Sequence, residues 1–301
     1  MTTASEDLRR FLDPEVVSKI SGMDVKARLV VEGFIAGLHK SPYKGFSVEF
    51  AEHRQYMPGD PLKHVDWKVY AKSDKFYVKE YEEETNLRAT IVIDASASMG
   101  YASGGMTKFD YATHLAAALS YLMLKQQDSV GLTLFDTKLR RHIPPHASAK
   151  QLHILLRELA EAKPGAETNI HESLRALTER VKRRGLIVLI SDLFDERGAL
   201  LSALKYFRHR KHEVIVFHVL DNEESEFGFD REAIFEDMET KEEIHVEPWR
   251  IRNEYAAEVR AWSEAIKREC REHRIDYVLM NTKTPFDVAL TSFLEKRSRL
   301  G

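Results

Sequence analysis

The sequence ATIVIDASASM, residues 89–99, is the most informative stretch of the chain. Its first five residues are apolar or β-branched, and the run ends abruptly at the carboxylate of Asp94. A short apolar run that ends in polar residues is typical of a strand buried on both faces of a parallel sheet. We therefore expect Asp94 at the carboxyl end of a central strand, the edge at which open α/β sheets bind ligands.

Two hydroxyl groups follow this carboxylate at alternate positions, in the pattern Asp94-x-Ser96-x-Ser98. Carboxylate and hydroxyl oxygens are ligands of hard divalent cations, so the loop is a candidate metal site. The alternative is that these side chains only cap a helix, which is the commoner role of such a short pattern when it stands alone.

The composition is that of a soluble globular protein, with 43% apolar and 31% charged residues among 301. A net charge of -3 argues against nucleic acid or an anionic membrane surface as the main partner. The single cysteine, Cys270, excludes an intrachain disulfide and fits a reducing compartment. Neither a signal peptide nor an apolar run of roughly 18 to 20 residues is apparent, so we expect a cytoplasmic protein without a membrane span.

The chain is expected to have two parts. Residues 1–84 combine helices at residues 5–38 with a small β-rich segment, in which residues 46–50 and 75–81 alternate like strands. Residues 85–301 form the main domain, in which apolar runs and helical patterns alternate.

This alternation predicts the elements of the main domain. Strands are expected at residues 87–94, 129–135, 138–143, 186–190, 214–220 and 276–280. Helices are expected at residues 109–126, 149–160, 169–183, 197–209, 250–273 and 285–296. Such an order indicates an α/β fold with a doubly wound, mainly parallel sheet and helices on both faces. An acidic segment at residues 222–248 interrupts the rhythm and is interpreted as a hairpin-like insertion.

A second apolar run, residues 186–190, also ends in polar residues, Ser191 and Asp192. Thr168 precedes a predicted helix between the two strands. If the strands are neighbours, Asp94, Thr168 and Asp192 fall on the same edge of the sheet, one loop apart. An all-oxygen set of this kind suits Mg2+, Mn2+ or Ca2+ and is poor for zinc or copper.

The loop at residues 94–99 resembles the metal-ion-dependent adhesion site of von Willebrand factor type A domains, and Thr168 and Asp192 match the second and third loops of that site. The resemblance implies a Rossmann-type fold and a magnesium ion with one position left for a partner's acidic side chain. The site residues that it implies are Asp94, Ser96, Ser98, Thr168 and Asp192. Their hydroxyl groups would bind the ion directly, and their carboxylates would hold waters or hydroxyl groups around it.

A second block reads GFSVEFAEHRQYMPGD at residues 45–60 and is followed by HVDW at residues 64–67. It resembles the signature of the bacterial family called domain of unknown function 58, in which this block precedes a von Willebrand type A domain. The resemblance implies a non-enzymatic, metal-dependent interaction module that works with a MoxR-type AAA+ ATPase in the assembly or maturation of protein complexes. Many members carry amino-terminal membrane helices, and we place this chain in the soluble branch.

The main alternative is a metal-dependent hydrolase, in particular a phosphoesterase, that uses Asp94 and Asp192. Haloacid-dehalogenase-type phosphatases need a second carboxylate two residues after the first as general acid, and this chain has Ser96 there. Lys108 is near in sequence but lies outside the motif. A Rossmann nucleotide binder is disfavoured because no G-x-G-x-x-G follows the first strand.

The upstream block offers a further candidate surface. Its polar and aromatic side chains either form a partner-binding face or hold the segment to the main domain through Trp67 and an Asp–Arg pair, and the sequence leaves both interpretations open. The residues concerned are Arg54, Tyr56, Asp60, Asp66 and Trp67.

Overall fold

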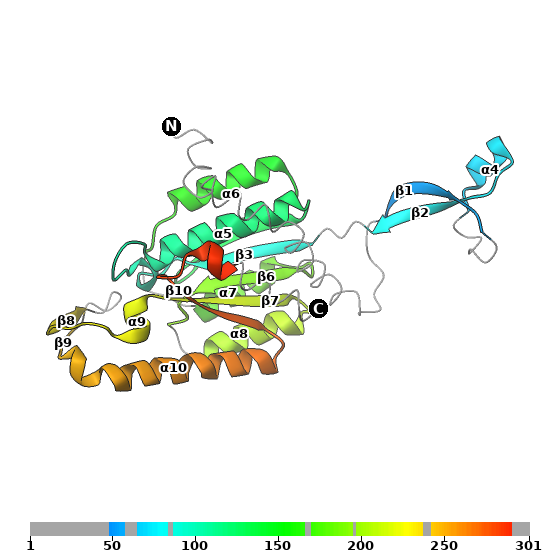
Figure 1. Cartoon of the computed structure of the whole chain (residues 1–301). Coiled ribbons are helices and arrows are strands. Elements are labelled where there is room, and N and C mark those ends of the chain that lie inside the picture. The colour runs from blue at the N-terminus through cyan, green and yellow to red at the C-terminus, as the bar shows by residue number, and fades with distance from the viewer. Residues whose placement is uncertain are drawn as a thin grey trace. The chain divides into compact units, whose positions relative to one another are not determined.

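The computed structural model describes residues 48–57, 65–83, 87–165, 170–194, 197–236 and 242–290 (Figure 1). Its contacts separate a small unit, with described residues 48–83, from a large unit, with described residues 87–290. The predicted helices at residues 5–38, the residue Thr168 and the end of the predicted closing helix lie outside the described residues. The predicted domain boundary between residues 84 and 85 stays a prediction.

The small unit is built on an antiparallel pair of strands, β1 (Val48–Gln55) and β2 (Tyr77–Glu83). These strands include most of the two segments for which strands are predicted in this region. Between them in sequence lies α4 (Trp67–Ser73), a helix that the sequence reading does not predict.

Aromatic side chains pack together in the small unit. Tyr70 stacks on Phe76 with 4.3 Å between ring centroids, and Trp67 meets both rings edge-on. Trp67 nevertheless keeps 56% of its surface exposed. These ring contacts lie within the small unit, so both the partner-binding face and the attachment to the main domain through Trp67 stay predictions. Asp60, another residue of that candidate surface, lies outside the described residues.

A six-stranded sheet in the order β10-β7-β6-β3-β4-β5 forms the centre of the large unit. Its strands are β3 (Arg88–Asp94), β4 (Ser129–Phe135), β5 (Leu139–His146), β6 (Leu186–Ser191), β7 (Glu213–Leu220) and β10 (Asp276–Asn281). Neighbouring strands are parallel except β4 and β5, which are antiparallel. The predicted α/β fold with a mainly parallel sheet is confirmed.

Helices cover both faces of this sheet (Figure 1). The longer ones are α5 (Lys108–Lys125), α6 (Ala149–Glu161), α7 (Ile170–Arg180), α8 (Arg197–His209) and α10 (Pro248–Glu272). One buried apolar cluster joins α7, α8 and α10 to the sheet through side chains such as Leu177, Leu204 and Ile266. Figure 1 places α5 and α6 on the opposite face from α8 and α10. None of the described helices combines the length and the apolar character that a membrane crossing requires.

The acidic segment at residues 222–248 holds a short helix followed by a hairpin of two antiparallel strands. These elements are α9 (Asn222–Glu226), β8 (Ala233–Glu236) and β9 (Glu243–Val246). Phe227 stacks on Phe235 of the hairpin and on Tyr255 of α10, so aromatic packing joins this segment to the main domain. The sequence predicts the hairpin but not α9.

The strand β3 lies at the centre of the sheet and positions the residues that follow it. It pairs in parallel with β4 on one side and with β6 on the other. Every residue from Ala89 to Asp94 is buried, which explains why the run is apolar without alternation. The first residue of its terminal loop, Ala95, donates its N–H to Phe135 O at 2.7 Å, so the loop starts in a defined direction.

Candidate metal centre

The carboxyl ends of β3 and β6 bring two of the predicted site residues to the same edge of the sheet. Asp94 is the last residue of β3, and Asp192 directly follows β6. Ile93 is paired with Ile190, so the two strands end side by side. The condition that the two strands are neighbours is met, whereas the place of Thr168 relative to them stays a prediction.

Asp94 is fully buried and hydrogen-bonded through both carboxylate oxygens. Its Oδ1 accepts the N–H of Ser96 at 2.9 Å, and its Oδ2 accepts the hydroxyl of Ser191 at 2.6 Å. Burial, followed by the negative charge of Asp192, raises the pKa of Asp94 to about 7, although these hydrogen bonds oppose the shift. The raised pKa indicates a carboxylate whose negative charge is not balanced by a neighbouring cation.

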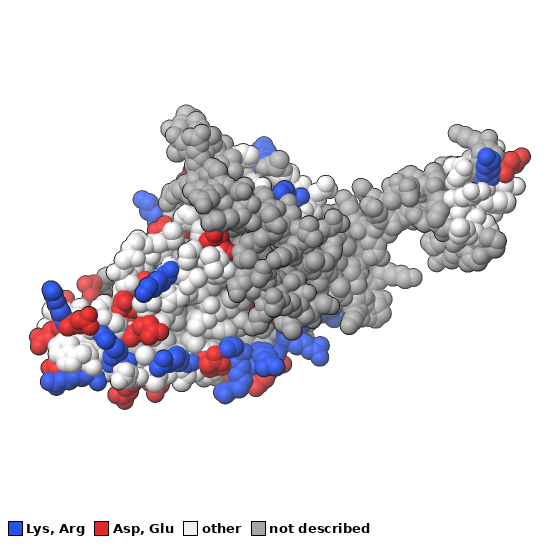
Figure 2. All heavy atoms as spheres, viewed as in Figure 1, with Lys and Arg blue, Asp and Glu red and all other residues white. Residues whose placement is uncertain are grey.

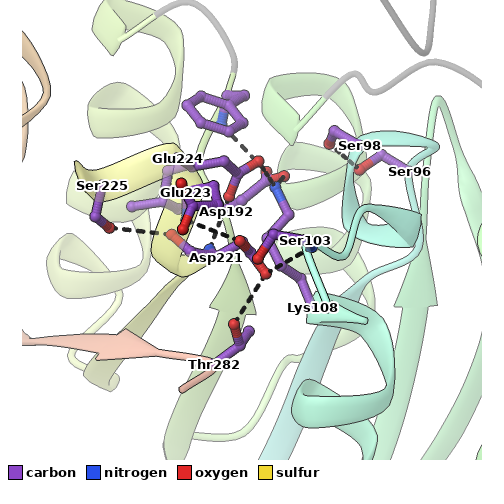
Figure 3. Close-up of polar contacts among 12 residues, drawn as sticks. Ser96, Ser98, Ser103, Lys108, Asp192, Asp221, Glu223, Glu224, Ser225 and Thr282 are labelled. Atoms are coloured by element: carbon purple, nitrogen blue, oxygen red, sulfur yellow. Dashed lines mark hydrogen bonds and ion pairs between the residues drawn. The ribbon is translucent and has the colours of Figure 1, made fainter. Parts of the chain in front are cut away.

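The two loop serines face each other. Ser96 Oγ and Ser98 Oγ are 3.0 Å apart, and Figure 3 shows both hydroxyl groups together at the end of their loop. The short 3-10 helix that begins here, η2 (Ser98–Gly100), has no side-chain cap, and α5 is capped by Thr107. The capping alternative therefore fails for the two serine hydroxyls, which are left as a pair of neighbouring oxygen donors.

Asp192 has a different partner, the ammonium group of Lys108 at the first position of α5. Lys108 Nζ lies 2.7 Å from Asp192 Oδ2, and both side chains are buried. The other oxygen of Asp192, Oδ1, accepts the N–H of Phe194 at 3.3 Å. The ammonium group also lies 2.5 Å from Glu224 Oε1, so it is shared between two carboxylates from different elements.

The environment of Lys108 keeps it charged. Burial by itself lowers the pKa of Lys108, but the ion pairs with Asp192 and Glu224 outweigh this effect and raise it. The ring of Phe194 covers the ammonium group at 4.8 Å, measured to the ring centroid. Lys108 is therefore a buried positive charge beside the third-loop aspartate.

A further buried carboxylate, Asp221, ties α9 to this edge of the sheet (Figure 3). Its Oδ2 accepts the N–H of Ser103 at 3.2 Å and the hydroxyl of Thr282 at 3.1 Å. Its side chain caps α9, while Glu224 Oε2 accepts the N–H of Asp221 at 2.8 Å. Although burial opposes it, this hydrogen bonding holds the pKa of Asp221 below its usual range. Glu224 is thus presented to Lys108 from a well-anchored turn.

The third loop has a strained backbone. Leu193 directly follows Asp192 and has a φ of 59°, a left-handed conformation that branched side chains such as leucine rarely adopt. Its N–H donates to Ser191 Oγ at 2.9 Å, and this same hydroxyl donates to Asp94. Ser191 therefore connects the third loop to the first, and backbone strain of this kind concentrates at functional sites.

Of the five predicted site residues, the structure brings together Asp94, Ser96, Ser98 and Asp192 at one edge of the sheet; the remaining residue, Thr168, lies outside the described part of the chain. Sequence reasoning missed the roles of Ser191, Lys108 and Glu224. Within the described ranges, no group of three or more histidine, cysteine or acidic side chains forms a metal cluster. A cation at this edge therefore depends on the serine hydroxyls as well as on carboxylates.

A comparison with known protein families identifies the family of this chain. Residues 52–265 match the family model described as "Protein of unknown function DUF58". The chain belongs to this family. This result confirms the family resemblance that the upstream block carries.

Relatives of this DUF58 protein include "Uncharacterized protein Rv1480" of Mycobacterium tuberculosis (strain ATCC 25618 / H37Rv), which is 24% identical over 95% of this chain and 91% of its own length. Similar solved structures include BatB from Bacteroides thetaiotaomicron, with a TM-score of 0.48 and 17% identity over 71% of this chain and 99% of that one. The SpRpn10 VWA domain gives a TM-score of 0.42 with 11% identity over 68% of this chain and 95% of that one.

Proposed function

We propose that this DUF58 protein is a non-enzymatic protein-interaction module whose docking point is a divalent cation at the carboxyl edge of the sheet. The observation that carries the proposal is the pair of serine hydroxyls, 3.0 Å apart, at the end of a strand whose last residue is a buried aspartate. The proposed site consists of Asp94, Ser96, Ser98, Thr168 and Asp192.

The chemistry of the donor set fits such an ion. Ser96 and Ser98 offer neutral hydroxyl oxygens, and Asp94 and Asp192 offer carboxylate oxygens, all of which are hard ligands. Mg2+ is the expected ion, with Mn2+ or Ca2+ as the other candidates. Nitrogen and sulfur ligands, which zinc and copper prefer, have no place in this set.

The balance of charges also favours a cation. Asp94, Asp192, Asp221 and Glu224 gather at this edge, and within the described part of the chain Lys108 is the one cation that contacts any of them. If all five groups are ionised, the cluster carries an excess of negative charge in a buried setting. Such an excess is unfavourable without a counter-ion and attracts one.

Some residues of the chain would bind the ion, and others would orient the side chains around it. Ser96 and Ser98, with Thr168, would hold the ion through neutral oxygens, while Asp94 is oriented by the hydroxyl of Ser191. A divalent ion held mainly by neutral ligands keeps much of its positive charge and attracts a carboxylate from another protein. Recognition of an acidic side chain thus suits this site better than turnover.

The partner that the family resemblance implies is a MoxR-type AAA+ ATPase, and the proposed setting is the cytoplasm, in assembly or maturation of protein complexes. The alternative, a phosphoesterase that uses Asp94 and Asp192, is disfavoured because Ser96 occupies the place of the general acid. Hydrolysis of a generic phosphate ester that disappears in Asp94→Ala would revive it.

The test measures binding of the purified chain to the MoxR-type ATPase of the same organism by biolayer interferometry. Because a chelator also removes the Mg2+ that the ATPase needs for its nucleotide, the decisive comparison is between two variants at constant Mg2+. Ser98→Ala is expected to weaken binding at least about tenfold. Ser202→Ala, which removes an exposed hydroxyl on α8, is the matched control and is expected to bind normally. Equal affinity of the wild type and Ser98→Ala would contradict the proposal.

A further inference from the structure

The proposed function does not use the most unusual charge at the site, the ammonium group of Lys108. This side chain is completely buried at the first position of α5, although a lysine is almost never fully buried unless it is paired. It lies between Asp192 from the third loop and Glu224 from α9, and Figure 3 shows it reaching into the group of carboxylates.

A buried ammonium group is retained only when nearby anions compensate for its loss of water. Asp192 at 2.7 Å and Glu224 at 2.5 Å provide this compensation. The rings of Phe194 and Tyr101 also lie near the ammonium group, at 4.8 Å and 6.0 Å measured to their centroids. Lys108 is therefore held as a fixed positive charge on one oxygen of Asp192.

This position brings Lys108 into conflict with a divalent ion. The carboxylate that the proposed site needs from the third loop is already paired with an internal cation. A divalent ion near Asp192 has to share this carboxylate with the ammonium group, and two positive charges in a poorly solvated site repel each other strongly.

We propose that Lys108 is an internal competitor of the divalent cation for Asp192, and that Glu224 sets the strength of this competition by holding Lys108 from the other side. The inference rests on the proposed metal site and adds a regulatory element to it. When Glu224 holds the ammonium group, Asp192 is more available to the metal. When Glu224 is withdrawn, Lys108 pairs with Asp192 alone and metal affinity falls.

The anchoring of α9 makes this control possible. Glu224 receives the N–H of Asp221, and Asp221 is bound to Ser103 and Thr282 from two other elements. The carboxylate of Glu224 therefore stays opposite Lys108 for as long as α9 stays in place. A movement of α9, for example on contact with a partner, would change the metal affinity of the site without touching a metal ligand.

The experiment is titration of metal-free protein with Mg2+ by isothermal calorimetry. Glu224→Gln keeps an oxygen for the N–H of Asp221 but loses the ion pair, and we expect it to bind Mg2+ several-fold more weakly than the wild type. The double variant Lys108→Met with Glu224→Gln removes one positive and one negative charge and leaves Asp192 with the N–H of Phe194 as its partner, so its folding is checked before titration. We expect it to bind Mg2+ about tenfold more tightly than Glu224→Gln alone.

Two further variants separate competition from a general structural effect. Lys108→Arg keeps the positive charge, and we expect its affinity for Mg2+ to stay close to that of the wild type. Lys267→Gln breaks an exposed ion pair with Glu264 on α10 and is the matched control, expected to leave Mg2+ binding unchanged. Circular dichroism melts identify any variant that does not fold.

The outcomes distinguish this inference from the proposed function. If Ser98→Ala abolishes Mg2+ binding of the wild type but the double variant binds no more tightly than Glu224→Gln, the competition is refuted and the metal site stands. If neither the wild type nor the double variant shows binding that depends on Ser98, the metal site itself fails and the inference fails with it. Binding by the double variant alone would indicate that Lys108 excludes the ion completely, which supports the competition.

Discussion

The loops after β3 and β6 each place an aspartate at the same edge of the sheet, but the two carboxylates are held differently. Asp94 accepts hydrogen bonds from a serine hydroxyl and a backbone N–H. Asp192 pairs with the buried ammonium group of Lys108. One aspartate is thus neutralised by the protein itself, and the other is left without a cation in contact among the described residues.

Asp94 and Asp192 therefore have different roles, although each simply ends an apolar run in the sequence. A buried carboxylate with only neutral partners gains most from an added cation, because its charge is still uncompensated. A carboxylate that is paired with an ammonium group gains less and has to be shared. The site is therefore asymmetric, with the first loop suited to receive an ion and the third loop already engaged.

The largest expected effect comes from neutralising the two aspartates in turn. Asp192→Asn leaves Lys108 with Glu224 alone, and we expect it to lower the free energy of unfolding by about 2 to 3 kcal/mol, because a buried charge loses a partner. Asp94→Asn removes an unbalanced charge but leaves one acceptor oxygen for two donors, the N–H of Ser96 and the hydroxyl of Ser191, so gain and loss oppose each other and we expect a change of less than about 1 kcal/mol. Urea denaturation of metal-free protein measures both, and equal losses would contradict the asymmetry.

A smaller effect is expected from the serines of the first loop. Ser98→Ala removes a neutral oxygen donor, and we expect the affinity for Mg2+ to fall about 10- to 100-fold with little change in stability. Calorimetric titration with Mg2+ measures the affinity, and Ser202→Ala on α8 is the control. If the two alanine variants bind Mg2+ equally well, the ion does not use the first loop.

The smallest expected effect comes from another buried aspartate, Asp128, which precedes β4 at the opposite edge of the sheet and tests how a carboxylate without a cation in contact behaves. Asp128 Oδ1 accepts the N–H of Leu87 at 3.0 Å, and burial raises the pKa of Asp128 to about 7. Because the folded pKa of Asp128 lies above its unfolded value, the contribution of this group to stability is fully present below about pH 4 and is lost as the pH rises to about 7.

Asp128→Asn should remove this group's share of the pH dependence, leaving the share of Asp94, and raise the free energy of unfolding at pH 7 by about 1 to 2 kcal/mol, allowing for relaxation around the buried group. Urea denaturation at pH 5 and pH 8 provides the measurement. A variant that is as pH-dependent as the wild type would show that Asp128 does not behave as an uncompensated carboxylate.

Much of the fold follows from local signals in the sequence. The apolar runs that become β3 and β6 are buried on both faces, and such runs leave few alternatives to a parallel sheet. Because the carboxyl ends of parallel strands share an edge, the meeting of Asp94 and Asp192 was predictable as well. The short helix α4 was not, because its seven residues carry too few turns for a helical period to stand out.

The charged part of the site could not be predicted from the sequence for a different reason. Lys108 is 84 residues from Asp192 and 116 residues from Glu224, and no local pattern relates them. A lysine at the start of a helix is normally exposed, and burial becomes acceptable only once tertiary structure supplies the anions. The short helix α9 that carries Glu224 is an acidic segment of five residues, which the sequence alone does not distinguish from a loop.

The central claim, that the first and third loops hold a divalent ion, is tested most directly by a crystal structure of the protein grown with Mn2+. The account predicts an anomalous difference peak at metal–ligand distance, about 2.2 Å, from both Ser96 Oγ and Ser98 Oγ. The absence of such a peak, with the two hydroxyls still hydrogen-bonded to each other, would contradict it.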